Sequence, residues 1–572
     1  MKRILSIMVA VAAAAMLPLA AQESINSTVE VERVYRGRLA DVTKMPIGME
    51  INDTLSNFKL KLDYPTFERP YKDLYEFSSL WAADLEPAGK PRYPWLYVKA
   101  GIAYPWMPDA DVYISPNLGG KFSFTVYYNH DSFWGDMPVL SVSPEGTSAS
   151  AASARGDRMV NRAGADIGYR WKKGEIKADV GYSNNYYAYY GSFLSAPDYT
   201  ALHTGAHDFT LLEASVGARS TVTDRNAFYY DVSLGYTYFD DDRYGDVFAG
   251  NGVREHSADV DLSFGATIKR RHKVYLRFVN SVSFYESRSS APASYNSGFW
   301  EATPTYRWES GRWHINAGVS VSSTYGSDAA HKPYSKAVFY PNVKASLEAV
   351  KNYLWIDLEA YGRNDVISHA DMGRMNPWFD GNIHTLSTAV PIAAGVDIRG
   401  VIRDKFSYML SAAYERVGGM IAFRNVGGLQ LPLQHDGDVV SAELELRWKS
   451  KDIKAFAGVS YHYYSNAESA LMKPSVEVSA MAEYNIRRRV FFRIDCYYRN
   501  SVTGIYSDAA EGSQVRSRIP GFVDLGARVS YVINERVAVY IEGDNLINSR
   551  IQYFLGYLEP GLSIGGGVYL KF

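Results

Sequence analysis

Cysteine is nearly absent from this sequence, and long hydrophobic runs are rare. The single cysteine, Cys496, cannot form a disulfide within the chain, so no disulfide framework can stabilise the fold. One hydrophobic run stands out, from Ile4 to Leu19, and it is too short and too close to the start to be a membrane helix. We therefore expect no helical membrane span in the mature protein.

An excess of charge of one sign is also missing. The formal net charge is −2, with acidic and basic residues interspersed, so nothing indicates nucleic acid as a partner. Catalytic patterns are missing too: the Gly-x-Ser-x-Gly elbow does not occur, and the 11 histidines are scattered. No pair of cysteines could hold zinc. We expect no enzyme activity, no catalytic or metal site and no cofactor.

Two groups of polar residues are candidate metal ligands. His203 and His207, four residues apart, would suit a metal on a helix, but Gly205 between them indicates a loop. Asp240-Asp241-Asp242, near Asn251, could bind calcium through oxygen ligands. We favour a solvated acidic loop tip for the aspartates and no metal at either place.

The first residues have the pattern of a secretory signal. Met1-Lys2-Arg3 is followed by the hydrophobic run and then by Ala20-Ala21-Gln22, a small-residue cleavage site. The sequence therefore predicts a signal peptide at residues 1–21 and export of the rest.

Apolar and polar residues alternate along much of the sequence. From Ala258 to Ile268 every even position is apolar and every odd position is polar or glycine, a period of two that no helix has. The same pattern recurs in segments 176–182, 442–448, 490–497 and 523–531. In segment 490–497, Cys496 falls on the apolar face. Strands with one apolar and one polar face are typical of a transmembrane β-barrel.

Connections between these segments alternate in length. Short turns are expected at 172–174, 224–226, 270–272, 310–311, 351–352, 403–404, 450–451, 487–489 and 534–536. Longer stretches are expected at 135–156, 187–206, 240–254, 365–382, 418–437 and 501–517. With strands near Tyr97 and Val112 and from Phe122 to Asn129, the count reaches about 22. Residues 93–572 are thus predicted to form an antiparallel barrel in the outer membrane of a Gram-negative cell, with lipid as a partner.

Aromatic residues make up 14% of the chain, including 45 Tyr. The clusters 186–190 and 461–464 lie at predicted outer strand ends, where we expect them to anchor in the headgroup zone; a stacking platform for a sugar or peptide is the alternative. The charges on the polar faces should keep the barrel interior wet and cross-linked. They are Asp259, Asp261, Glu443, Glu445, Arg447, Lys449, Asp524 and Arg528.

The chain ends on an alternating strand whose last residue is Phe572. A terminal strand that finishes on Phe resembles the signal by which the barrel-assembly machinery of the outer membrane recognises its substrates. We therefore expect that machinery as a partner during insertion, with Phe572 as the insertion signal.

The final residues also resemble a known family. The stretch 542–548, Glu-Gly-Asp-Asn-Leu-Ile-Asn, followed by Tyr553, Pro560-Gly561 and 570–572, is similar to the end of TonB-dependent receptors. The resemblance implies transport of a solute across the outer membrane. It also implies an N-terminal plug domain, for which residues 22–92 are too short. Thr28, Val29, Glu30 and Val31 faintly resemble the segment that contacts TonB.

Residues 22–92 lack sustained alternation, and 67–77 is rich in aromatic and mixed charged residues, unlike a disordered tail. One interpretation is that this segment fills the lumen; the other is a periplasmic extension. Two functions follow: a solute-transporting barrel, or a scaffold that anchors a multi-protein complex through a periplasmic or lipoprotein partner.

Overall fold

A computed structural model describes residues 94–572. Short gaps in that range are residues 119, 192–204, 221–227, 245–251, 269–270, 288–293, 328–332, 382–384, 386, 404 and 508–513. The predicted signal peptide, the segment 22–92 and the TonB-contact residues 28–31 lie outside the described residues. Within the described part of the chain, no helix is both long and apolar enough to cross a membrane.

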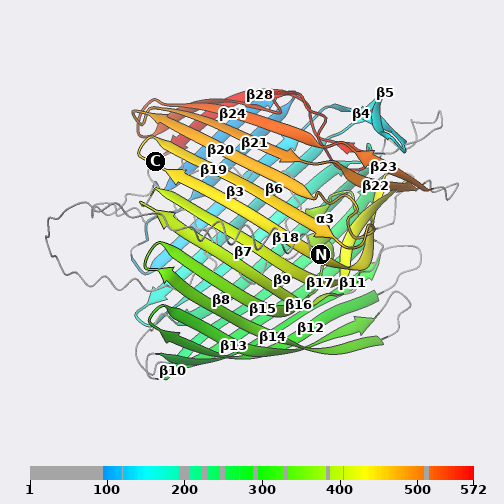
Figure 1. The fold of residues 1–572 in the computed structure, drawn as a ribbon. Helices are drawn as coiled ribbons and strands as arrows, with labels where there is room; N and C mark the ends of the chain where they lie inside the picture. The colour runs from blue at the N-terminus through cyan, green and yellow to red at the C-terminus, as the bar shows by residue number, and fades with distance from the viewer. Residues whose placement is uncertain are drawn as a thin grey trace, which may run out of the picture. The chain divides into compact units, whose positions relative to one another are not determined.

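The described residues form a closed antiparallel barrel (Figure 1). The main sheet has 24 strands; β22 and β23 form a side hairpin, which leaves 22 in the wall. The wall strands are β1 (Leu96–Tyr104), β2 (Met107–Ile114), β3 (Phe122–Phe133), β6 (Arg158–Trp171), β7 (Gly174–Ala188), β8 (Ala206–Ser220), β9 (Phe228–Tyr244), β10 (Val253–Ile268), β11 (His272–Ser287), β12 (Ser294–Ser310), β13 (Trp313–Ser327), β14 (Pro333–Val350), β15 (Leu354–Asp365), β16 (Thr388–Ile402), β17 (Phe406–Val426), β18 (Leu429–Lys449), β19 (Ile453–Tyr464), β20 (Val476–Ile486), β21 (Val490–Arg499), β24 (Phe522–Val532), β25 (Val537–Asp544) and β28 (Ser563–Lys571). The predicted count of about 22 is confirmed.

Closure occurs where the last strand meets the first. β28 pairs with β1 from Tyr97 opposite Lys571 to Tyr104 opposite Ile564. Phe572 extends this pairing through its backbone, because its N–H donates to the carbonyl of Leu96 at 2.9 Å. No free sheet edge is left along the wall, as a spanning sheet requires.

The alternation read from the sequence is the inside-outside alternation of the wall. On β10, Phe264 and Ile268 expose 40% and 50% of their surface, whereas Asp261 on the other face pairs with Arg277 at 2.6 Å. Cys496 lies beside Ala480 and Leu525 on the outward face. Such an apolar exterior is stable in lipid, and the protein is an integral outer-membrane barrel.

The two ends of the barrel differ. Tight turns close one end at the predicted places that the structure describes, and Asn352, Arg487 and Arg488 adopt positive φ there, as tight hairpin turns require. Residues 224–226, 270 and 404 of the predicted turns lie outside the described residues. Barrels of this kind have short periplasmic turns, so the other end is extracellular.

The extracellular end carries the remaining elements, at the right of Figure 1. They are the hairpin β4 (Asp136–Ser143) and β5 (Gly146–Arg155), the helix α3 (His369–Met375), the hairpin β22 (Val502–Ser507) and β23 (Gln514–Ile519), and the short pair β26 (Gln552–Phe554) and β27 (Tyr557–Leu558).

One predicted loop was wrong. Residues 418–437 continue as paired strands of β17 and β18, which turn at Gly427 and Gly428. A bulge between Val417 and Met420 bends this hairpin. Beyond it, residues 420–423 are all buried, so both faces of the hairpin tip are covered. Tertiary packing therefore extends strands through a glycine-rich stretch whose composition is typical of a loop.

Candidate functional site

The largest buried apolar cluster of the described residues lies at the extracellular end rather than in the wall. It joins side chains from β7 to β11 with others from the β17–β18 tip and from β21 to β24, strands far apart around the barrel. Two long connections bridge them: residues 366–381, between β15 and β16, and residues 545–562, between β25 and β28. We call these two connections the lid.

Aromatic rings hold the two parts of the lid together. The Trp378 ring stacks on Tyr557 with 3.9 Å between centroids and 16° between planes. The Trp378 ring also makes edge-to-face contacts with Tyr187 and Tyr190 at the end of β7, with 6.0 Å between ring centroids in each case. Its indole N–H donates to the carbonyl of Ala188 at 3.2 Å. Aromatic pairs of this geometry stabilise by about 0.5–1.5 kcal/mol beyond area burial. Trp378 thus fixes both lid connections to one side of the wall.

The β17–β18 tip holds the lid from another side. Asn425 and Gln430, both fully buried, donate side-chain N–H groups to the carbonyl of Leu555 at 2.7 and 2.9 Å. The Tyr557 hydroxyl donates a hydrogen bond of 2.6 Å to the carbonyl of Gly428. Buried backbone groups need such partners, and each satisfied bond avoids a penalty of about 1–3 kcal/mol.

Two buried histidines attach the first lid connection to β8, β9 and β10. His207 faces the carbonyl of Pro377 through Nδ1 and Asp241 through Nε2, at 2.5 Å each. His369 faces Glu255 through Nδ1 at 3.0 Å and the carbonyl of Gly381 through Nε2 at 2.9 Å. Both nitrogens of each imidazole thus face an acceptor.

The helix α3 is short and depends on these contacts. Ser368 caps its N-terminus and forms a capping box with Asp371. The carboxylate of Glu255 also accepts from the backbone N–H of His369 at 2.7 Å, which adds a negative charge at the first turn. Five of its seven residues are buried.

Buried charges complete the lid. Arg499, 1% exposed, lies over the rings of Phe522 and Tyr553, with 5.7 and 5.4 Å from the guanidinium carbon to their centroids. Arg158 donates to Glu559 at 3.1 Å. Burial raises the pKa of the Glu559 carboxyl, although Arg158 opposes that shift. Burial also raises the pKa values of the Tyr190 and Tyr557 hydroxyls well above their usual range.

Beneath the lid, the inward face of the wall is charged. Ion pairs join neighbouring inward positions around the barrel, with N···O distances of 2.6–3.7 Å. They are Lys99–Asp109, Arg277–Asp261, Lys344–Glu359, Arg399–Asp357, Lys454–Glu483 and Arg493–Asp495. The lumen wall is therefore polar and cross-linked.

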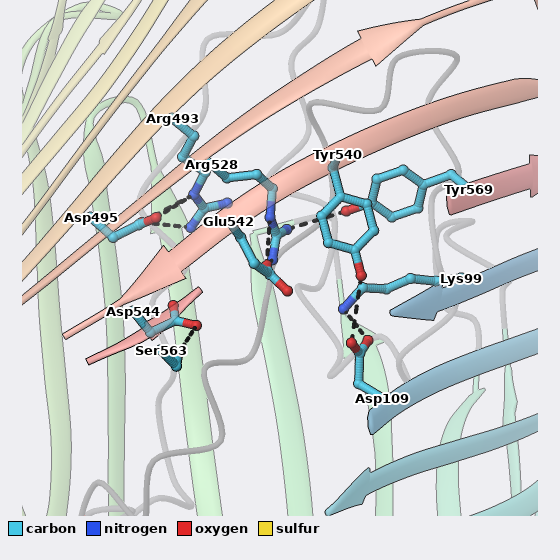
Figure 2. A network of polar contacts seen from close by, with 10 residues as sticks. All are labelled: Lys99, Asp109, Arg493, Asp495, Arg528, Tyr540, Glu542, Asp544, Ser563 and Tyr569. Carbon is cyan, nitrogen blue, oxygen red and sulfur yellow. Dashed lines mark hydrogen bonds and ion pairs between the residues drawn. The ribbon is translucent and has the colours of Figure 1, made fainter. Parts of the chain in front are cut away.

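Figure 2 shows this network at the closing seam. Arg528 pairs with Glu542 and donates to the Tyr569 hydroxyl at 3.3 Å. The Tyr540 ring lies between Arg528 and Lys99, 5.1 and 5.5 Å from its centroid, and Lys99 reaches Asp109 at 2.6 Å. Cations and rings alternate across the junction of β25, β28 and β1.

Several residues singled out from the sequence take other roles. His207 and Asp241 lie in paired strands, not loops, and Asp241 is fully buried, so the predicted solvated acidic tip is wrong at that residue. His203 and Asn251 lie outside the described residues. Tyr189 and Tyr190, predicted to anchor in headgroups, are 4% and 5% exposed and belong to the buried cluster.

Other expectations hold. Tyr461 and Tyr463 expose 46% and 55% of their surface on the outward face, as the headgroup anchor requires. Of the lumen charges predicted from the sequence, Asp261, Arg447 and Arg528 form inward pairs with Arg277, Glu445 and Glu542.

Among the comparisons with known proteins, only solved structures match this chain. No protein-family model matches the sequence. No curated protein matches it significantly. Among solved structures, the FrpB iron transporter of Neisseria meningitidis aligns with a TM-score of 0.64 and 11% identity, over 85% of this chain and 82% of that one.

Two further solved structures agree with this match. The copper transporter OprC aligns with a TM-score of 0.62 and 11% identity, over 84% of this chain and 81% of its own. FpvA of P. aeruginosa, solved with a pyoverdine and iron, aligns at 0.62 and 10%, over 85% and 72%. The chain has the fold of the TonB-dependent receptors, which confirms the predicted resemblance in fold.

Proposed function

We propose that this barrel transports a solute across the outer membrane and that the lid gates the extracellular entrance of its lumen. The observation that carries the proposal is the joining of distant wall strands by the lid, through Trp378, Tyr557 and the carbonyl of Leu555, above a charged interior. Similarity in fold to iron and copper transporters supports it. A non-enzymatic role fits the same similarity.

A scaffold is the second candidate, and one feature favours it. The lid is held by buried hydrogen bonds of the kind found in a permanent core, including those of Asn425, Gln430 and His369. A barrel that anchors partners has no need to open.

An engineered disulfide that holds the lid in place, called the lock below, would distinguish the two functions. Phe379 and Gln430 form an isolated backbone bridge, so their Cα atoms lie at a separation that a disulfide can span. The variant carries Phe379→Cys and Gln430→Cys in a Cys496→Ser background, and the two single-cysteine variants are its controls.

Under a condition in which a strain lacking the protein grows more slowly, we expect cells with the oxidised lock to grow as slowly as that strain, and reduction to restore growth. Wild-type growth with a fully oxidised lock would contradict gated transport and support the scaffold, as would a stoichiometric partner recovered by gentle detergent purification and mass spectrometry.

A further inference from the structure

A pocket lies at the extracellular rim, at the edge of the buried cluster, which supplies Leu140, Phe522 and Leu558 to its lining. It has a volume of about 350 Å³ and is formed where β21 and β24 end, beneath the β4–β5 hairpin and beside residues 547–552. Volumes of about 300–1,000 Å³ are typical of small-molecule sites. The elements that form it are the wall, a hairpin and part of the lid.

The pocket is continuous with the lipid-facing surface. Tyr498 on β21 follows Ile494 and Cys496 on the outward face, and it is 37% exposed. Val523 on β24 also faces outward, because its neighbours Phe522 and Asp524 are the buried, inward residues. Together with the exposed Ile547, these side chains place an apolar wall where the outer leaflet meets the loops.

The polar side of the pocket is built by a rigid turn. Asn545 and Ser549 exchange two hydrogen bonds, from Asn545 Nδ2 to the Ser549 carbonyl at 2.9 Å and from the Ser549 N–H to Asn545 Oδ1 at 2.7 Å. Asn545 and Asn548 adopt positive φ, and Asn548 Oδ1 accepts from the Leu562 N–H at 3.0 Å. This turn presents Ile547 and Arg550 in a fixed arrangement.

Two groups in the pocket have unused hydrogen-bonding capacity. Arg550 is exposed and forms no ion pair with any described residue. Gln552 is 2% exposed; its Oε1 accepts from the Thr147 hydroxyl at 3.0 Å, but its Nε2 has no hydrogen-bond partner among the described residues. A buried donor without a partner costs about 1–3 kcal/mol, so a ligand acceptor there would be stabilising.

We propose that this pocket binds an anionic lipid of the outer leaflet, with one acyl chain against Val523, Ile547 and Leu558 and a headgroup phosphate on Arg550. Arginine pairs with phosphate through two parallel hydrogen bonds, and Gln552 supplies a donor for a lipid oxygen. The inference depends only on the barrel lying in the membrane, so it stands whether the protein transports or anchors.

Native mass spectrometry of the full-length protein in mild detergent tests this site. With equal amounts of phosphatidylglycerol and phosphatidylcholine, we expect one phosphatidylglycerol to be retained per protein. Arg550→Gln should lower that retention about tenfold, and Arg550→Lys should lower it less, because a charge remains. Ile547→Asp should abolish it by charging the apolar wall.

Controls separate the site from general attraction of lipid and from binding of a free anion. Arg254→Gln, at the extracellular end of β10 and outside the pocket lining, should leave retention unchanged. An excess of inorganic phosphate should not displace the lipid. Equal retention of both lipids, insensitivity to Arg550→Gln, or full displacement by phosphate would each overturn the proposal. Folding of every variant is checked by its heat-dependent migration in gels.

Discussion

At the scale of single residues, His369 makes several of the hydrogen bonds that hold the lid in place. It pairs with Glu255 through Nδ1, donates its backbone N–H to the same carboxylate, and faces the carbonyl of Gly381 through Nε2. It is 2% exposed, and Glu255 is fully buried. Loss of the imidazole would leave the buried Glu255 side chain with one hydrogen-bond partner fewer.

We predict that His369→Phe loosens residues 366–381 while the barrel stays folded. Leaving a buried acceptor without its hydrogen-bond partner costs about 1–3 kcal/mol, and this contact is one that attaches the lid. Hydrogen exchange should become much faster in these residues and stay unchanged in β10. His272→Phe, at the periplasmic end of β11, is the control; protection of the lid in both variants would refute this account.

Lys473 makes the stability of residues 465–475, in the connection between β19 and β20, dependent on pH. It lies in the connection between β19 and β20, next to the fully buried Met472, and its Nζ is 5.7 Å from the centroid of the Tyr464 ring. Burial lowers the pKa of the Lys473 ammonium from 10.5 to about 7. No carboxylate pairs with it among the described residues, so burial acts unopposed.

The sign of this effect follows from the depressed pKa. In the unfolded chain Lys473 takes up its proton near pH 10.5, whereas in the folded protein it does so near 7, so folding stability falls as pH decreases between these values. We predict that residues 465–475 become more sensitive to protease from pH 10 to pH 7, and that Lys473→Met removes the change. A pH profile that is identical in both proteins would rule this out.

Residue roles at the lid could not be predicted from the sequence. Alternation decides which wall face a side chain occupies, but it does not say which strand ends are covered by returning loops. Tyr189 and Tyr190 have the composition of a membrane belt, but they are buried by residues that come later in the sequence. The His207 ring stacks on Tyr189, and Trp378 and Tyr557 pack on Tyr190. His207 and Asp241 pair across β8 and β9, beyond any local signal.

At the scale of elements, the seam between β28 and β1 depends on close backbone approach. A Cβ at Gly567 would lie 2.1 Å from the carbonyl oxygen of Ala100 and 2.7 Å from the Tyr540 hydroxyl. The ring of Tyr540 covers the space that side chains at Gly101 and Gly567 would take, an arrangement known to compensate for glycine in sheets.

Gly567→Leu should therefore prevent closure. The new side chain meets backbone atoms that cannot move without separating β1 from β28, so we expect loss of the compact, heat-modifiable form in gels. Gly120→Leu is the matched control, because a Cβ there meets no atom within 4 Å. A barrel with Gly567→Leu that migrates like the wild type would show that the seam tolerates side chains.

Strands of the wall were predictable because lipid and water impose opposite requirements on their two faces. The stretch 418–437 was not, because Gly418, Gly419, Gly427 and Gly428 are typical of loops. There the covering residues lie on other strands, as in the contact of Phe423 with Phe554. Local composition therefore misassigns a hairpin that other loops stabilise.

At the scale of the whole molecule, the fold follows from the sequence, and the packing of the lid across its extracellular end does not. Turn positions, strand number and the final strand all derive from short-range patterns. The lid connection 545–562 contacts Tyr190 at the end of β7 and Gly428 at the β17–β18 turn, through pairs of residues 368 and 129 positions apart in the sequence. Only the closed barrel brings them together.

One measurement tests the lid directly: single-channel conductance in planar bilayers. In a protein lacking residues 24–90, so that the N-terminal segment cannot contribute, residues 368–381 are replaced by a Gly-Ser linker. We predict that this replacement opens a large, steady conductance that the parent lacks. An unchanged conductance would contradict the conclusion that the lid closes the lumen.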